Sequence, residues 1–274
     1  MKPADYPMQD DLSDFARPYA EEVERRSIGI SGEDHLFGED PYQSVGIHKA
    51  AEPNGSVFAF IHGGGWTNGY KEWNNFMAPA YTSQGVTFVS IGYRMAPRII
   101  FPLGFDDCAL GVSWIFKNIA DYGGDPRRIF LGGHSAGGHY SSLLAVKRDW
   151  QTKLGLPVDV IRGCIPVSGV YRFGENSGLS QWPRFLGEID SGNDVAASPI
   201  LFTNDATCPF LMAHGENDFP HLIAQAEEME TALRTSGTNI ERVPLAGCNH
   251  LAAHYVTGEL NGDWVNKVLN FITI

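Results

Sequence analysis

Ser135 lies in a run of small residues, Gly132-Gly133-His134-Ser135-Ala136-Gly137-Gly138, between an apolar β-rich stretch and a helical pattern. A tight strand-to-helix turn forces the serine backbone into a strained conformation, and side chains on its neighbours would clash with the adjacent strand and helix. The serine oxygen then projects from the sheet edge, beside a helix N-terminus that favours negative charge. The pattern predicts a nucleophile at Ser135. The alternative is a structural turn capped by this serine.

A second glycine-rich turn lies upstream, where Ile61-His62-Gly63-Gly64-Gly65-Trp66 ends a predicted strand. Successive glycines let backbone N–H groups approach a substrate oxygen without obstruction by side chains. We predict an oxyanion hole formed by the amides of Gly64, Gly65 and Ala136. His62 is expected to tie the loop down by hydrogen bonds rather than to transfer protons. A purely structural turn is the alternative here too, but the position upstream of the nucleophile turn favours the catalytic interpretation.

A serine on such a turn works with an acid and a histidine that follow it in the chain, each at a strand end. Asp218 follows a predicted strand over 210–214, and His250 follows one over 240–245. We therefore predict that His250 takes the serine proton and later protonates the leaving group, while Asp218 fixes the histidine tautomer and stabilises the imidazolium. The alternatives left open are Glu216, Asp194 and Asp205 for the acid, and His254 and His221, both in predicted helices, for the base.

Short apolar runs that alternate with helical patterns must position these residues, and this alternation predicts a mostly parallel sheet flanked by helices. Strands are predicted at 43–48, 57–62, 86–92, 128–133, 161–168, 210–214 and 240–245. Helices are predicted at 11–26, 74–84, 105–122, 136–147, 221–236 and 263–272. With 274 residues, of which 43% are hydrophobic, the chain is expected to form one α/β domain over residues 1–274.

Residues 171–201 interrupt the alternation of predicted strands and helices. The stretch is rich in Gly, Ser and Asn, yet it contains Trp182, Phe185 and Leu186. Long segments without their own regular structure often cover functional sites. We predict a small lid insertion at 171–201, with an ordinary long loop as the alternative.

Composition narrows the possible partners. The formal charge of −12 argues against nucleic acid, which binds basic surfaces. Neither a leader with an apolar core nor a run of eighteen apolar residues is found, so a cytoplasmic protein without a membrane span is expected. The four cysteines, Cys108, Cys164, Cys208 and Cys248, are far apart in apolar stretches and are predicted to be buried thiols rather than disulfides or metal ligands.

Five motifs stand out along the chain: His62-Gly63-Gly64-Gly65-Trp66, Ile91-Gly92-Tyr93-Arg94-Met95-Ala96-Pro97, Gly133-His134-Ser135-Ala136-Gly137-Gly138-His139, His214-Gly215-Glu216-Asn217-Asp218 and Asn249-His250. Together they resemble the hormone-sensitive-lipase-like esterases of the α/β-hydrolase superfamily and, more closely, the kynurenine formamidases (arylformamidases). Val167-Ser168-Gly169-Val170-Tyr171 also points to the formamidases, whereas three successive glycines are more typical of the esterases. The resemblance implies an α/β-hydrolase fold, an acyl-enzyme intermediate, and cleavage of small carboxylic esters or amides without metal or organic cofactor.

Aromatic residues that could shape the pocket favour an apolar or aromatic small-molecule substrate. They are Trp66, Tyr70, Trp73, Trp182 and Phe185, of which Trp66 is the one predicted substrate contact. A non-catalytic binding module on the same fold and an acyltransferase remain open as alternatives. A metal hydrolase is disfavoured because no H-E-x-x-H or comparable ligand spacing occurs. A homodimer also stays open, because related folds often dimerise through edge strands or terminal helices.

Overall fold

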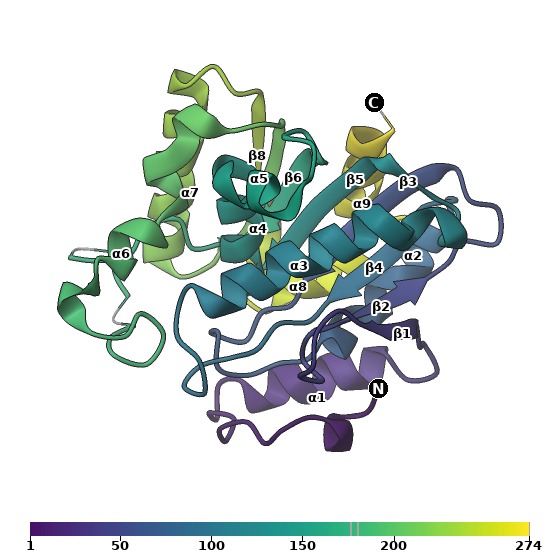
Figure 1. The fold of residues 1–274 in the computed structure, drawn as a ribbon, viewed down its shortest axis with the longest axis horizontal. Helices are drawn as coiled ribbons and strands as arrows, with labels where there is room; N and C mark the ends of the chain where they lie inside the picture. The colour runs from purple at the N-terminus through teal and green to yellow at the C-terminus, as the bar shows by residue number, and fades with distance from the viewer. Residues whose placement is uncertain (176, 180, 274) are drawn as a thin grey trace.

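An eight-stranded, mostly parallel sheet forms the centre of the molecule in the computed structural model, which describes residues 1–175, 177–179 and 181–273 (Figure 1). The strands are β1 (Glu33–Leu36), β2 (Ser44–His48), β3 (Gly55–Ile61), β4 (Thr87–Ile91), β5 (Gly124–His134), β6 (Ile161–Val167), β7 (Phe210–Asn217) and β8 (Ile240–Asn249). Their order across the sheet is β1-β2-β4-β3-β5-β6-β7-β8, and the pairs β1–β2 and β2–β4 are antiparallel. The carboxyl ends of β3 to β8 therefore share one edge, where ligands bind in open α/β sheets.

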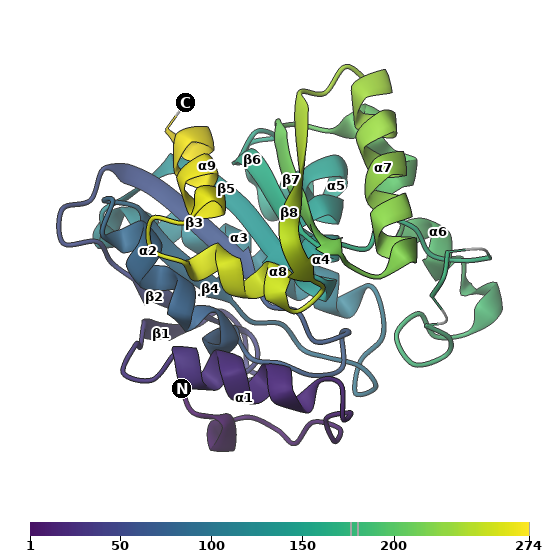
Figure 2. The same cartoon turned by 180° about the vertical axis from the view of Figure 1, so that it is seen from behind.

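Helices cover both faces of this sheet. On one face lie α3 (Leu103–Asn118), α4 (Ala136–Val146), α5 (Asp149–Leu154) and α7 (Pro220–Thr235), and on the other lie α1 (Arg17–Arg26), α2 (Ala78–Thr82), α8 (Ala252–Tyr255) and α9 (Asp263–Ile272) (Figures 1 and 2). The short α6 (Asn193–Ala196) stands out at the side, near α7. Short 3₁₀ helices occur at Pro3–Asp5, Lys71–Met77, Ile119–Tyr122, Ile189–Ser191, Pro199–Asp205 and Val256–Gly258.

Alternating side chains of the central strands build two hydrophobic cores. On β3, Val57, Ala59 and Ile61 face the α3–α4 side, whereas Phe58 and Phe60 face the α1–α9 side. Successive side chains of a strand point to opposite faces, so a strand covered on both sides must be apolar throughout. Each fully buried aliphatic or aromatic side chain contributes about 1.5–3 kcal/mol, and these two layers hold the sheet edge that carries the site.

The predicted fold class is confirmed, and each predicted strand is present with boundaries shifted by a few residues. The prediction missed β1, because this antiparallel edge strand is polar and largely exposed, and it missed α5 and α8, which are too short to show a helical period. The four cysteines are buried and free, as predicted. Among the described residues, none of the helices has both the length and the apolar character that crossing a membrane requires.

Candidate active site

Ser135 occupies the turn between β5 and α4 with φ 53° and ψ −114°, a conformation that L-residues rarely adopt. The glycines around it are required by sterics. A Cβ at Gly133 would lie 2.3 Å from the backbone of Gly137, and one at Gly137 would lie 2.0 Å from the carbonyl oxygen of Ile61. The Ser135 amide donates to the Val167 carbonyl at 2.9 Å. The surrounding backbone therefore holds the strained serine in place, as functional sites commonly do.

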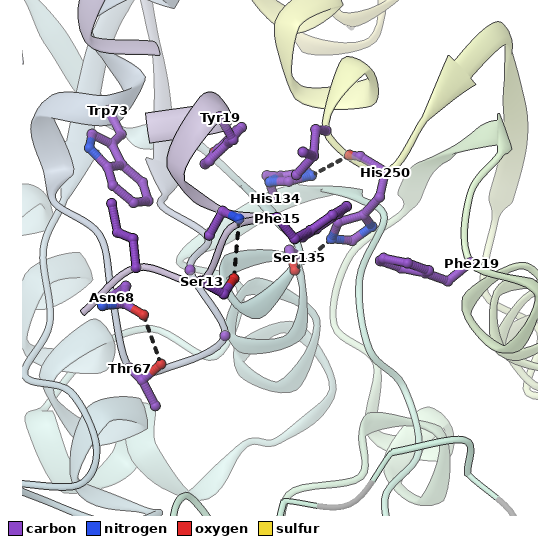
Figure 3. Close-up of a pocket in the computed structure, with 15 residues that line it drawn as sticks. Ser13, Phe15, Tyr19, Thr67, Asn68, Trp73, His134, Ser135, Phe219 and His250 are labelled. Atoms are coloured by element: carbon purple, nitrogen blue, oxygen red, sulfur yellow. Dashed lines mark hydrogen bonds between the residues drawn. The ribbon is translucent and has the colours of Figure 1, made fainter. Parts of the chain in front are cut away.

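The structure brings the three predicted catalytic side chains into one hydrogen-bonded chain. Figure 3 shows two of its members, Ser135 and His250. The Nε2 atom of His250 lies 3.0 Å from the Oγ atom of Ser135, and its Nδ1 atom lies 2.8 Å from Oδ1 of Asp218. Because a carboxylate accepts, Nδ1 carries the proton, which leaves the Nε2 lone pair directed at the serine hydroxyl. This is the arrangement in which a histidine can take the proton of an attacking serine.

Asp218 is held as a carboxylate by several donors. The Ser168 hydroxyl donates to its Oδ2 at 2.5 Å, and the Phe219 amide donates to its Oδ1 at 2.8 Å. Burial alone would raise the pKa of Asp218, but the hydrogen bonds from His250, Ser168 and the Phe219 amide outweigh it and hold that pKa well below the usual range. Ser168 is a functional residue that the motifs do not reveal, although its position at a strand end, before a glycine, is a usable signal.

The alternative acids and bases lie in other surroundings. Glu216 is exposed and accepts from the Gly247 amide, Asp205 is exposed, and Asp194 lies at the start of α6. His221 is in the first turn of α7. His254 is fully buried, where its Nδ1 atom is bonded to the Tyr19 hydroxyl at 2.8 Å and its ring stacks on His134. It packs the core, as expected for a histidine within a helix.

The predicted oxyanion loop, residues 62–66, turns sharply after β3. Gly64 has a φ of 116°, and a Cβ there would lie 1.9 Å from the carbonyl oxygen of Asn68, so glycine is obligatory. Gly65 has a φ of 61°, and a Cβ there would lie 4.0 Å from Oγ1 of Thr67, which is an ordinary contact. His62 is fully buried and donates from Nδ1 to the Gly63 carbonyl at 2.7 Å. Burial lowers the pKa of His62 to about 4, so it holds the loop as a neutral side chain, in accord with the prediction.

A cavity of about 280 Å³ opens onto Ser135 (Figure 3). Its walls come from the segment before and within α1, the oxyanion loop, and the two loops that carry Asp218 and His250. The lining residues are Leu12, Ser13, Phe15, Ala16, Tyr19, Gly64, Gly65, Thr67, Asn68, Trp73, His134, Ser135, Phe219, His250 and Leu251. No Asp, Glu, Lys or Arg is among these described residues. The cavity therefore suits a small, uncharged and mostly apolar group.

The structure corrects the prediction that Trp66 contacts substrate. Trp66 does not line the cavity, and its side chain is 3% exposed, stacked on Phe185 with ring centroids 4.4 Å apart. The described residues of 171–201 do not line the cavity either, and the part around Phe173 and Phe185 packs against Trp66 instead. Of the five aromatic residues proposed for the pocket, Trp73 alone lines it. The N-terminal arm, defined as residues 12–19, lines the cavity in the place expected for segment 171–201.

The order of the strands, with a strained serine on the turn after β5, places the chain in the class of α/β hydrolases. The chain belongs to the BD-FAE family, whose model matches residues 45–233. This range includes Ser135, Asp218 and the oxyanion loop, and excludes His250 and the N-terminal arm.

Curated relatives are similar over most of this chain. Esterase LipQ of Mycobacterium tuberculosis (strain ATCC 25618 / H37Rv) is 32% identical over 66% of the chain and 46% of its own length. A probable isoprenylcysteine alpha-carbonyl methylesterase, ICMEL1 of Oryza sativa subsp. japonica, is 34% identical over 78% of the chain and 56% of its own length. The chain thus spans about half the length of the curated relatives it matches.

Solved structures share the fold. A hyperthermophilic esterase from the archaeon Pyrobaculum calidifontis superposes with a TM-score of 0.79 at 19% identity, covering 96% of this chain and 93% of that one. A putative thioesterase from Silicibacter sp. TM1040 gives a TM-score of 0.76 at 20% identity, covering 94% and 93% of the two chains. At these identities the likeness shows the α/β-hydrolase fold alone.

Proposed function

We propose that this chain is a carboxylesterase-type serine hydrolase in which Ser135, His250 and Asp218 form the catalytic triad. The observation that carries the proposal is the hydrogen-bonded chain from Asp218 through His250 to the strained Ser135, which lines a cavity whose described lining residues include no Asp, Glu, Lys or Arg. The esterases and the methylesterase among the relatives support the same reaction class.

In the proposed reaction, the Oγ atom of Ser135 attacks the substrate carbonyl carbon while Nε2 of His250 takes the hydroxyl proton. The carbonyl oxygen becomes an oxyanion that accepts from the amides of Gly64, Gly65 and Ala136. His250 then gives its proton to the departing alcohol or amine, which leaves an acyl group on Ser135. Water attacks this ester with the same histidine as base, and the acid is released.

The finer proposal is that the substrate is a small ester or an N-formyl arylamide with an aromatic leaving group. Phe219 lies beside His250 with ring centroids 5.0 Å apart, and Phe15 lies 5.7 Å from Phe219. Because His250 protonates the leaving group, we place that group against these two rings, which line the cavity together with His250 (Figure 3). A cavity of about 280 Å³ favours a short acyl group such as formyl or acetyl.

The test compares a short p-nitrophenyl ester with N-formylkynurenine under identical conditions, with Ser135→Ala as control. Turnover of either substrate that disappears in Ser135→Ala supports the hydrolase. A much higher kcat/KM for the formyl amide supports the arylformamidase assignment, whereas cleavage of the ester alone replaces it with another ester as substrate. Equal activity of Ser135→Ala rejects Ser135 as the nucleophile. No turnover of either substrate rejects the catalytic assignment and favours a non-catalytic binding module. Formation of a new ester with an added alcohol would reveal acyl transfer.

A further inference from the structure

The oxyanion loop carries backbone strain that its own residues do not relieve. Gly64, Gly65 and Trp66 have successive φ values of 116°, 61° and 63°. A positive φ is easily adopted by glycine but is an outlier for a bulky residue such as tryptophan, and it persists only where the surroundings over-determine it. Something outside the loop must therefore hold Trp66, and through it the two preceding amides.

The Trp66 indole is fixed by a hydrogen-bonded relay. Its Nε1–H donates to Nδ1 of His139 at 3.1 Å, and Nε2 of His139 lies 2.7 Å from the carbonyl oxygen of Ala197. Indole N–H groups only donate and carbonyl oxygens only accept, so these partners define a neutral His139 that carries its proton on Nε2. Burial lowers the pKa of His139 to about 3, which maintains this neutral form.

His139 also connects directly to the nucleophile turn. It lies one turn into α4, and its backbone N–H donates to the carbonyl oxygen of Ser135 at 2.9 Å. A single fully buried residue thus joins the backbone of Ser135 to the residue that follows Gly65. The carbonyl of Trp66 is held separately by the Ala96 amide at 2.9 Å, and its ring stacks on Phe185 and also contacts Phe173.

We propose that His139 is a positioning residue that fixes the oxyanion loop relative to Ser135, through Trp66 on one side and the Ala197 carbonyl on the other. The proposal rests on the proposed function, because the loop has amides to position only if an oxyanion forms there. Preorganised donors act most strongly in the transition state, where misplacement lowers kcat, whereas ground-state binding also draws on the arm and on the loops that carry Asp218 and His250. The relay therefore affects kcat rather than KM.

Four substitutions distinguish a positioning role of His139 from a role in packing alone. Trp66→Phe keeps the ring on Phe185 and removes only the N–H donor. His139→Asn places an acceptor near the position of Nδ1, whereas His139→Gln places a donor near Nε2 and leaves Trp66 without a partner. The control is His48→Asn, because His48 is also buried and hydrogen-bonded, to Asn75, but lies on β2, outside the relay.

The experiment measures kcat, KM, Tm and the inhibition constant of a trifluoromethyl ketone, which forms a tetrahedral oxyanion on the serine. We expect Trp66→Phe and His139→Gln to lower kcat roughly tenfold with KM within about twofold, and to weaken the ketone by the same factor as kcat/KM. His139→Asn should retain kcat within about threefold, and His48→Asn should lower Tm with kcat unchanged.

Two results would overturn the relay while the hydrolase stands. One is Ser135-dependent turnover with an unchanged kcat in folded Trp66→Phe and His139→Gln. The other is a loss of kcat that follows the loss of Tm across all four variants, His48→Asn included, since this indicates packing alone. If the wild-type protein shows no turnover that Ser135→Ala abolishes, the proposed function fails, and the positioning role fails with it.

Discussion

Two segments pack against the candidate site, and they do so in opposite ways. The N-terminal arm, residues 12–19, lines the cavity in front of Ser135 with Leu12, Phe15 and Tyr19. Segment 171–201 turns its aromatic side chains into the core against Trp66 and contributes no described residue to the cavity. Under the proposed function, the arm is expected to contact the substrate, and the segment is expected to hold the oxyanion loop in place. A change in the first should alter selectivity, and a change in the second should alter stability and rate.

The largest effect is expected from Phe185→Ala in segment 171–201. Phe185 is 1% exposed and stacks on Trp66, so its truncation should lower the free energy of unfolding by about 3–5 kcal/mol. The ratio of kcat/KM values for aromatic and methyl esters should stay unchanged, because the side chain does not reach the cavity. Urea unfolding and the two ester assays check this prediction. A changed ratio with normal stability would show that the segment does line the site.

How much of the site can be predicted from sequence depends on how far apart in the chain the interacting residues lie. Gly133, Gly137 and Ser135 form a local turn whose sterics require those residue types, so a short motif reveals it. Asp218 and His250 follow from the order of strands. The position of Phe15 in the cavity wall and the burial of Trp66 depend on which segments, distant in the chain, pack together. Sequence alone does not distinguish an aromatic residue of the core from one that lines a cavity.

The next largest effect is a loss of stability in acid, and it should be similar in the two regions. His134, beside the arm, and His139, beside the segment, are fully buried, and burial lowers the pKa of each to about 3. Below the unfolded-state pKa of about 6.5 the unfolded chain binds a proton that the folded chain does not, so stability is complete above that pH and falls as the pH falls. Each histidine should lower the free energy of unfolding by about 2 kcal/mol as the pH falls from 6.5 to 4.5.

The check is urea unfolding at both pH values for His134→Asn and His139→Asn. Each variant should lose about 2 kcal/mol of the wild-type dependence on pH, whatever its stability at pH 6.5. A wild-type pH dependence retained in full by either variant would mean that the histidine is already protonated in the folded protein.

The smallest effect is expected from Phe15→Ala, the matched substitution in the arm. Phe15 is 55% exposed and contacts Phe219, so stability should change by less than about 1 kcal/mol. Loss of one wall for an aromatic leaving group should reduce kcat/KM for phenyl esters roughly fivefold to tenfold relative to methyl esters. Equal losses for both esters would show that the arm does not contribute to selectivity. A large loss of stability would place Phe15 in the core and remove the contrast with Phe185.

In the proposed triad His250 activates Ser135 as a nucleophile, and labelling with a fluorophosphonate followed by peptide mass spectrometry measures that activation. We expect one adduct, on Ser135, that is absent from Ser135→Ala and forms at least 100-fold more slowly in His250→Asn, in line with the size of general-base effects. Labelling of another residue, or equally fast labelling of Ser135 in His250→Asn, would contradict it.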